Sequence, residues 1–311
     1  MRLLRRLAES RWIRLAVRAL AVLLLVLLAL RFRQLWHEQH VDFSDADATV
    51  LALAGVVSFI AVVAYGCVWP VILREIGTPP PRGSVRIFLQ SQLGKYVPGS
   101  VWQYAGRVGL ARAHGVAVRS TVLSLGIEVA ASALAAVTVG LFVLPLVAAV
   151  PLALVLAGLA FIAAVRGGRL ADIAIRFVRR IVPVPVEEFR LVFRAAPRMS
   201  VLYLPVWALY GTAFWLTGRA LFPVPASDFV LFAAAFALGW LVGMAAVFAP
   251  GGIGVREAVL VGLLAPSVGQ REAIVIAAAS RLLLTAADLV GGGVAILIPR
   301  LSPRGVGSAA K

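Results

Sequence analysis

The sequence contains little of what most catalytic and metal sites are built from. Among its 311 residues there is one cysteine, Cys67, and there are three scattered histidines, His37, His40 and His114. One cysteine excludes a disulfide framework, and these residues lack the spacing of a metal site. No nucleophile accompanies a base, and no carboxylate pair has a useful spacing. We therefore expect no metal, no cofactor and no enzymatic activity.

Charged residues are also scarce, and most of them are arginines. They make up 14% of the chain, whereas hydrophobic residues make up 61% and the mean hydropathy is +0.96. This composition exceeds what a soluble domain of this length can bury, so it indicates an integral membrane protein. The net charge is +16, but the basic residues lie between apolar runs and form no basic face. Nucleic acid is therefore not an expected partner.

Long apolar runs divide the chain. About 20 apolar residues in a helix cross the hydrocarbon core. Seven runs are long enough: Ile13–Leu30, Thr49–Leu73, Val118–Leu144, Leu146–Val165, Val201–Phe222, Phe229–Phe248 and Glu272–Ile298. Two further apolar stretches, Ser84–Leu110 and Ala249–Ala265, are broken by proline and glycine. The sequence predicts an all-α polytopic membrane protein, one integral domain over residues 1–311 with about seven to eight transmembrane helices.

The arginines predict the orientation of the chain. They are concentrated before the first run, and acidic residues follow it, so the N-terminus is expected in the cytoplasm of a cell membrane. Seven crossings would leave a basic C-terminal tail outside. Either one broken stretch crosses the membrane as well, or both are re-entrant and the basic tail violates the rule that positive residues stay on the cytoplasmic side. Residues 166–198 hold eight arginines. This segment is expected to be a basic cytoplasmic loop, either fully solvated or forming an interfacial helix on anionic headgroups.

The two broken stretches resemble each other. The Pro-Gly pair at 98–99 aligns with the pair at 250–251 at an offset of 152, without a gap. Each is followed by a short apolar helix, a basic turn and a span that contains an ionisable residue. This pattern predicts an internal repeat, with one half at about 49–144 and the other at about 201–298.

A Pro-Gly break has a physical consequence inside a membrane. Proline removes a backbone donor and glycine loosens the chain, so helical hydrogen bonding stops. Such a backbone is tolerated only where it is buried in protein or lines a wet cavity. The helix that starts after the break offers free N–H groups to an anion. Paired breaks are typical of a transporter's midplane site. Ordinary loops between spans are the alternative.

Three ionisable residues lie deep inside predicted spans: Glu128 near the middle of 118–144, and Arg281 and Asp288 within 272–298. Each costs about 2.5–3.5 kcal/mol at the membrane centre, so each needs a partner. One interpretation is structural, with Glu128 paired to Arg107 or Arg281. The other is functional, with arginine binding a lipid phosphate while a carboxylate receives a proton or a cationic headgroup. The candidate substrate-binding residues are Gln92, Lys95, Pro98, Gly99, Gln103, Arg107, Glu128, Pro250, Gly251, Gly252, Gly254, Arg256, Glu257, Arg281 and Asp288.

Two motifs resemble a known family. They are "QLGKYVPGSVWQYAGR", Gln92 to Arg107, and "APGGIGVREAVL", Ala249 to Leu260. The chain is similar to the transmembrane family named for lysylphosphatidylglycerol synthase, the flippase-like domain of the multiple peptide resistance factor. The resemblance implies an eight-crossing bundle with re-entrant elements and a role in lipid translocation or a lipid pathway, without a cofactor. Full-length synthases add a soluble domain that this chain lacks, so we do not expect that synthesis.

Two functions follow as expectations. The first is a flippase-like protein of the cell envelope that binds and translocates an anionic or aminoacylated phospholipid, or a polyprenyl-phosphate-linked lipid. The alternative is a non-transporting membrane partner that presents a lipid substrate to an envelope glycosyltransferase or lipid synthase, with residues 166–198 as its docking surface. Anion conduction through a wet basic cavity is a further possibility. The sequence does not specify the lipid or the oligomeric state.

Overall fold

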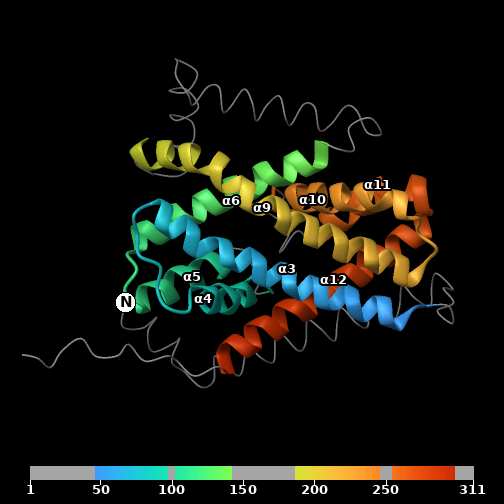
Figure 1. Cartoon of the computed structure of the whole chain (residues 1–311), viewed down its shortest axis with the longest axis horizontal. Coiled ribbons are helices and arrows are strands. Elements are labelled where there is room, and N and C mark those ends of the chain that lie inside the picture. Colours follow the sequence, from blue (N-terminus) through green and yellow to red (C-terminus); the bar gives the residue numbers. More distant parts are fainter. Residues whose placement is uncertain (1–45, 97–101, 142–185, 246–253, 298–311) are drawn as a thin grey trace, which may run out of the picture.

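The computed structural model describes residues 46–96, 102–141, 186–245 and 254–297 (Figure 1). All regular elements in these ranges are helices, as the sequence predicts. They are α3 (Ala48–Glu75), α4 (Ser84–Gln92), the 3₁₀ helix η1 (Leu93–Tyr96), α5 (Trp102–Ala113), α6 (Val118–Gly140), α9 (Val186–Leu221), the 3₁₀ helix η3 (Ala226–Asp228), α10 (Phe229–Ala245), α11 (Val255–Val268) and α12 (Gln270–Leu297).

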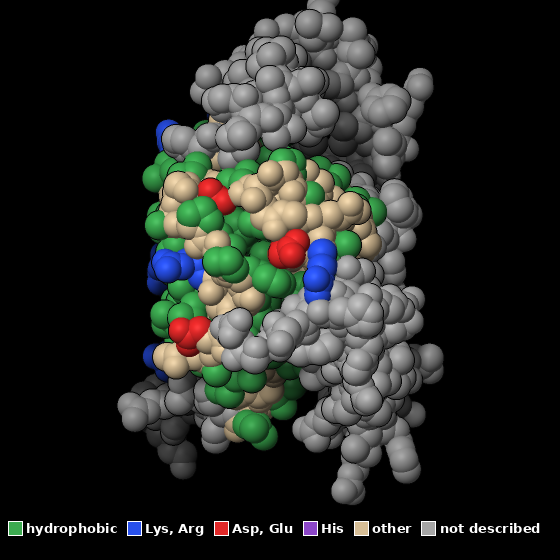
Figure 2. Space-filling model, turned by 90° about the vertical axis from the view of Figure 1, so that its right-hand side faces the viewer, with side chains coloured by type: hydrophobic (Ala, Val, Ile, Leu, Met, Phe, Trp, Pro, Cys, Tyr) green, Lys and Arg blue, Asp and Glu red, His purple; other side chains and the backbone are tan. Residues whose placement is uncertain are grey.

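Five of the described helices are long and apolar enough to cross a membrane. They are Ala48–Glu75, Val118–Gly140, Arg190–Leu221, Ala226–Met244 and Gln270–Leu297. These match five of the seven predicted runs, and the runs at 13–30 and 146–165 lie outside the described residues. The predicted total of seven to eight crossings therefore stays a prediction. Hydrophobic side chains cover much of the face in Figure 2, and charged side chains lie between them in small groups.

Helix α9 begins earlier than the sequence suggests. It starts at Val186, whereas the predicted span starts at 201, so residues 186–198 continue the helix and are not part of a separate loop. The reason is amphipathic packing: Ala195, Ala196 and Met199 are buried, while Arg194 is exposed. The rest of the predicted basic segment, residues 166–185, lies outside the described residues.

Helices α3 and α9 pack antiparallel. At one end the Asp47 N–H donates to the Ala220 carbonyl at 2.9 Å. At the other end Arg198 Nη1 lies 3.6 Å from Glu75 Oε1. Helix α12 runs parallel to α3, because Gly55 lies against Leu283 and Phe59 lies against Gly291.

Helices α4 and α5 form a hairpin between α3 and α6. The C-terminal half of α3 meets the start of α6, since Trp69 Nε1 donates to Ser124 Oγ at 3.0 Å. Helix α4 follows the end of α3, and α5 leads into the start of α6, so this hairpin begins and ends at the same end of the molecule. The two helices pack against each other. A Cβ on Gly94 would lie 2.6 Å from the Trp102 carbonyl carbon, so the chain reverses tightly.

Helices α10 and α11 form the corresponding hairpin between α9 and α12. They also pack against each other, and they lie at the other end of the molecule from α4 and α5 (Figure 1). The order of helix, hairpin and helix thus occurs twice, as α3, α4–α5 and α6 and as α9, α10–α11 and α12. The second copy runs in the opposite direction, because α9 is antiparallel to α3. Helix α6 begins at Val118 and α12 at Gln270, a difference of 270 − 118 = 152. The Pro-Gly breaks themselves, within 97–101 and 246–253, lie outside the described residues.

Small residues and aromatic rings fill the core between the helices. Trp207 contacts the rings of Tyr210, Phe236 and Trp240, with the Trp240 centroid 5.0 Å away. A Cβ on Gly211 would lie 2.7 Å from Ala233 Cα, so α9 and α10 approach at backbone distance. Lipid tails are as apolar as the helix surfaces, so there is no hydrophobic driving force between helices in a membrane. Close van der Waals packing of this kind holds the helices together instead.

Candidate functional site

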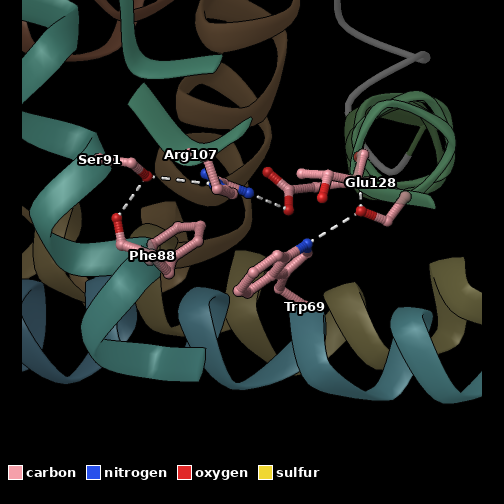
Figure 3. Close-up of polar contacts among 7 residues, drawn as sticks. Trp69, Phe88, Ser91, Arg107 and Glu128 are labelled. Atoms are coloured by element: carbon pink, nitrogen blue, oxygen red, sulfur yellow. Dashed lines mark hydrogen bonds and ion pairs between the residues drawn. The ribbon is translucent and has the colours of Figure 1, made fainter. Parts of the chain in front are cut away.

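Arg107 on α5 and Glu128 on α6 form a buried ion pair (Figure 3). Arg107 Nη1 lies 2.5 Å from Glu128 Oε2, and the two side chains are 1% and 4% exposed. Arg107 Nε also donates to Ser91 Oγ at 3.1 Å, and its guanidinium carbon lies 4.3 Å from the centroid of the Phe88 ring. Of the two partners considered for Glu128, the structure therefore selects Arg107.

This ion pair joins four helices. Arg107 comes from α5 and Glu128 from α6, while Ser91 and Phe88 come from α4. Trp69 of α3 lies below the guanidinium, with its ring centroid 5.7 Å from the guanidinium carbon (Figure 3). Arg107, one of the candidate substrate-binding residues, therefore lies inside the bundle, where its guanidinium packs on aromatic rings. Gln92, Lys95 and Gln103 are partly exposed.

Asp288 of α12 contacts the segment that precedes the first Pro-Gly motif. Its Oδ2 lies 2.5 Å from Lys95 Nζ and accepts a hydrogen bond from the Tyr96 hydroxyl at 2.7 Å. The Asp288 carboxylate is buried, and its Oδ1 has no hydrogen-bond partner among the described residues. Helix α12, from the second half of the chain, is thus linked by its carboxylate to the first half.

Arg281 of α12 contacts the segment that follows the second Pro-Gly motif. Its Nη1 lies 3.6 Å from Glu257 Oε1, and the two side chains are 15% and 26% exposed. Glu257 Oε2 accepts the Gly254 N–H at 2.7 Å, which caps the start of α11. Gly254 has φ +86°, a backbone conformation that favours glycine.

The two halves of the chain thus contain corresponding ion pairs with exchanged signs. In the first half the arginine lies on the short helix α5 and the carboxylate on α6. In the second half the carboxylate lies on the short helix α11 and the arginine on α12. The first pair is closed and buried, whereas the second is longer and partly exposed. The second pair is therefore the more accessible of the two to a ligand.

Arg256 of α11 is buried beside this second pair. It is 8% exposed, and its guanidinium carbon lies 4.4 Å from the centroid of the Phe236 ring. Its Nε and Nη2 have no hydrogen-bond partner within the described ranges. An arginine side chain stays protonated in proteins, so Arg256 is a buried cation.

The remaining predicted site residues are placed only in part. Arg281 and Asp288 lie two turns apart on α12 and bind opposite motif segments. Pro98, Gly99, Pro250, Gly251 and Gly252 lie outside the described residues.

Sequence reasoning missed several contributors to the site. The sequence alone predicts no role at this site for Tyr96, Ser91, Phe88 or Phe236. Their roles depend on contacts between helices, for which the sequence carries no local signal. No group of His, Cys, Asp or Glu that could hold a metal occurs in the described part of the chain.

Comparison of the chain with known protein families gives no match, and comparison with curated proteins gives no similar sequence.

Proposed function

We propose that this protein binds a phosphate-bearing lipid between its two halves and moves the headgroup across the membrane, as the resemblance to the flippase-like family suggests. One observation carries the proposal. Helix α12 binds the charged segment beside each Pro-Gly motif. Its Asp288 contacts Lys95 and Tyr96, and its Arg281 contacts Glu257. A site between repeats, formed beside broken helices, is typical of secondary transporters.

The inverted order of the two halves supports alternating access. One hairpin, α4 and α5, begins and ends near Glu75, and the other, α10 and α11, begins and ends near Asp47. A rocking of the halves would open the site first to one side and then to the other. The contact between Lys95 and Asp288 joins the halves, so it would have to break and reform in each cycle.

The same order supports a topology for the cell membrane. The end of α12 lies at the Glu75 end of α3, since the two helices run parallel. Arg74, Arg82 and Arg86 lie at or just after that end. By the positive-inside rule this side is cytoplasmic, with the N-terminus and the basic tail on it. Each hairpin begins and ends on one side, so it adds either no crossing or two. The total number of crossings is then even, and the basic C-terminal tail lies on the same side as the N-terminus and not outside.

A transport assay tests the proposal. Purified protein would be reconstituted into liposomes with fluorescent phosphatidylglycerol or a fluorescent polyprenyl-phosphate sugar, and membrane-impermeant dithionite would report the label that reaches the outer leaflet. We expect faster movement of at least one lipid, and loss of that movement in Lys95→Met and Asp288→Asn. Glu75→Gln, at an exposed pair, is the control and should transport normally. Folded protein that moves neither lipid, with unchanged variants, contradicts the proposal.

A second candidate function is a membrane partner that holds a lipid for an envelope glycosyltransferase or synthase. The observation that favours it is a basic stripe at the start of α9, where Arg190, Arg194 and Arg198 are all exposed at a spacing of four residues. Co-purification of such an enzyme should then be lost when the three arginines are replaced by glutamine. Retention of transport without any bound enzyme would reject this alternative.

A further inference from the structure

Among the described residues, the charges around Arg281 and Asp288 of α12 do not cancel. Lys95 is paired with Asp288, and Arg281 is paired with Glu257, so these four residues are neutral in sum. Arg256 adds one positive charge, and its contact is with the ring of Phe236. Burial of an uncompensated charge is costly, so one negative charge is the complement that this cluster requires.

The neighbouring segments do not alter this sum. Residues 97–101, "VPGSV", and residues 246–253, "AVFAPGGI", adjoin the cluster in the chain and contain no ionisable side chain. The charge that balances Arg256 is therefore not supplied by either Pro-Gly segment.

The free atoms of Arg256 also define a shape. Nε and Nη2 are adjacent on one edge of the planar guanidinium, and neither has a hydrogen-bond partner among the residues that the structure describes. This edge donates two parallel N–H groups, which bind two oxygens of one anion. A phosphodiester has two non-bridging oxygens that share one negative charge. A phosphomonoester has three terminal oxygens and about −1.5 to −2 charges at neutral pH.

We propose that Arg256 holds the phosphodiester group of the lipid and that the cluster selects a diester over a monoester. This inference rests on the proposed function and specifies its substrate class. The side chains of Arg281 and Glu257 are partly exposed, so the lipid headgroup reaches Arg256 past this pair. Glu257 contributes to the selection of a diester, because its negative charge keeps the net charge of the cluster at one positive charge.

The test compares two short-chain lipids with the full chain in detergent. Phosphatidylglycerol is a diester and phosphatidic acid is a monoester, and their binding would be measured by calorimetry. We expect the wild type to prefer the diester and Arg256→Gln to weaken diester binding by about ten-fold or more. Arg219→Gln is the matched control, since Arg219 also lies on a ring, that of Trp215, but is exposed.

A second variant changes the charge without touching Arg256. Glu257→Gln raises the surplus of the cluster from one to two, so it should shift the preference toward phosphatidic acid by about ten-fold. An unchanged preference in this variant overturns the inference, even if Arg256→Gln does not fold.

The possible failures are distinguishable. Equal binding of the two lipids by the wild type, or unchanged binding by a folded Arg256→Gln protein, overturns the diester inference and leaves the proposed function standing. Binding of neither lipid contradicts both. Glycerophosphoglycerol, which has the same headgroup without acyl chains, is a third probe. Affinity equal to that of phosphatidylglycerol would assign the site to a soluble diester and not to a lipid.

Discussion

Arg107 and Glu128 form an ion pair that is enclosed by protein, with Nη1 of the arginine 2.5 Å from Oε2 of the glutamate. Its counterpart in the second half, Arg281 with Glu257, is longer and partly exposed. A buried pair with additional hydrogen bonds holds helices in place, whereas an open pair can exchange its partner for a ligand. Both halves thus contain an ion pair between a short helix and the helix that follows it. The first pair holds helices together, whereas the second can bind a ligand.

Loss of one partner from the closed pair should destabilise the protein strongly. Glu128→Ala leaves the Arg107 guanidinium buried without a counter-charge, which costs about 3–5 kcal/mol. The free energy of unfolding in mixed micelles measures this effect. Replacing both residues with apolar ones, Arg107→Met with Glu128→Leu, should recover most of the loss.

The control for this experiment is the pair of Arg198 and Glu75, whose side chains are 79% and 33% exposed. Glu75→Ala should change the free energy of unfolding by about 0–1 kcal/mol, because exposed pairs contribute little. Equal losses in Glu128→Ala and Glu75→Ala would show that the buried pair is not a structural tie.

The first hairpin should depend on a glycine at position 94. A Cβ there would lie 2.6 Å from the Gln103 nitrogen and from the Trp102 carbonyl carbon, which are backbone atoms that cannot rotate away. We expect Gly94→Ala to lower the free energy of unfolding by about 1–3 kcal/mol. Gly106→Ala on α5 is the control, since a Cβ there meets nothing within 4 Å. If both variants are equally stable, η1 and α5 do not touch in the membrane.

The hairpins should enter the membrane from opposite sides. Because Cys67 is the only cysteine, Cys67→Ser gives a cysteine-free chain for labelling. We expect Arg82→Cys and His114→Cys, which flank the first hairpin, to react with an impermeant maleimide from one side. Ser227→Cys and Gln270→Cys, which flank the second hairpin, should react from the other side. Labelling of Arg82→Cys and His114→Cys from opposite sides would mean that the first hairpin crosses the membrane.

The contact between Lys95 and Asp288 should couple the two halves energetically. A double-mutant cycle with Lys95→Ala and Asp288→Asn is expected to give a coupling energy of about 0.5–3 kcal/mol in the free energy of unfolding. The same cycle with Lys95→Ala and Glu257→Gln should be additive within about 0.5 kcal/mol, because these residues share no ion pair. Additivity in the first cycle would refute a link through this pair.

The helices and their approximate bounds could be predicted from sequence wherever apolar residues dominate. The runs at 118–144 and 272–298 correspond to α6 and α12 within a few residues. The start of α9 could not be predicted from hydropathy, because the arginines of residues 186–198 lower the local hydropathy. The helix nevertheless includes these residues.

The sequence by itself determined the class of this protein and the positions of its unusual residues. Composition and hydropathy are sums over residue types, so they fix that apolar helices form and that Glu128, Arg281 and Asp288 interrupt them. The tertiary structure decided which partner each charge has. Tyr96 and Asp288 are 192 residues apart, and their contact depends on how each helix is rotated and packed. For the same reason only the structure distinguishes Arg107, which is paired with Glu128, from Arg256, whose Nε and Nη2 have no hydrogen-bond partner in the described part of the chain.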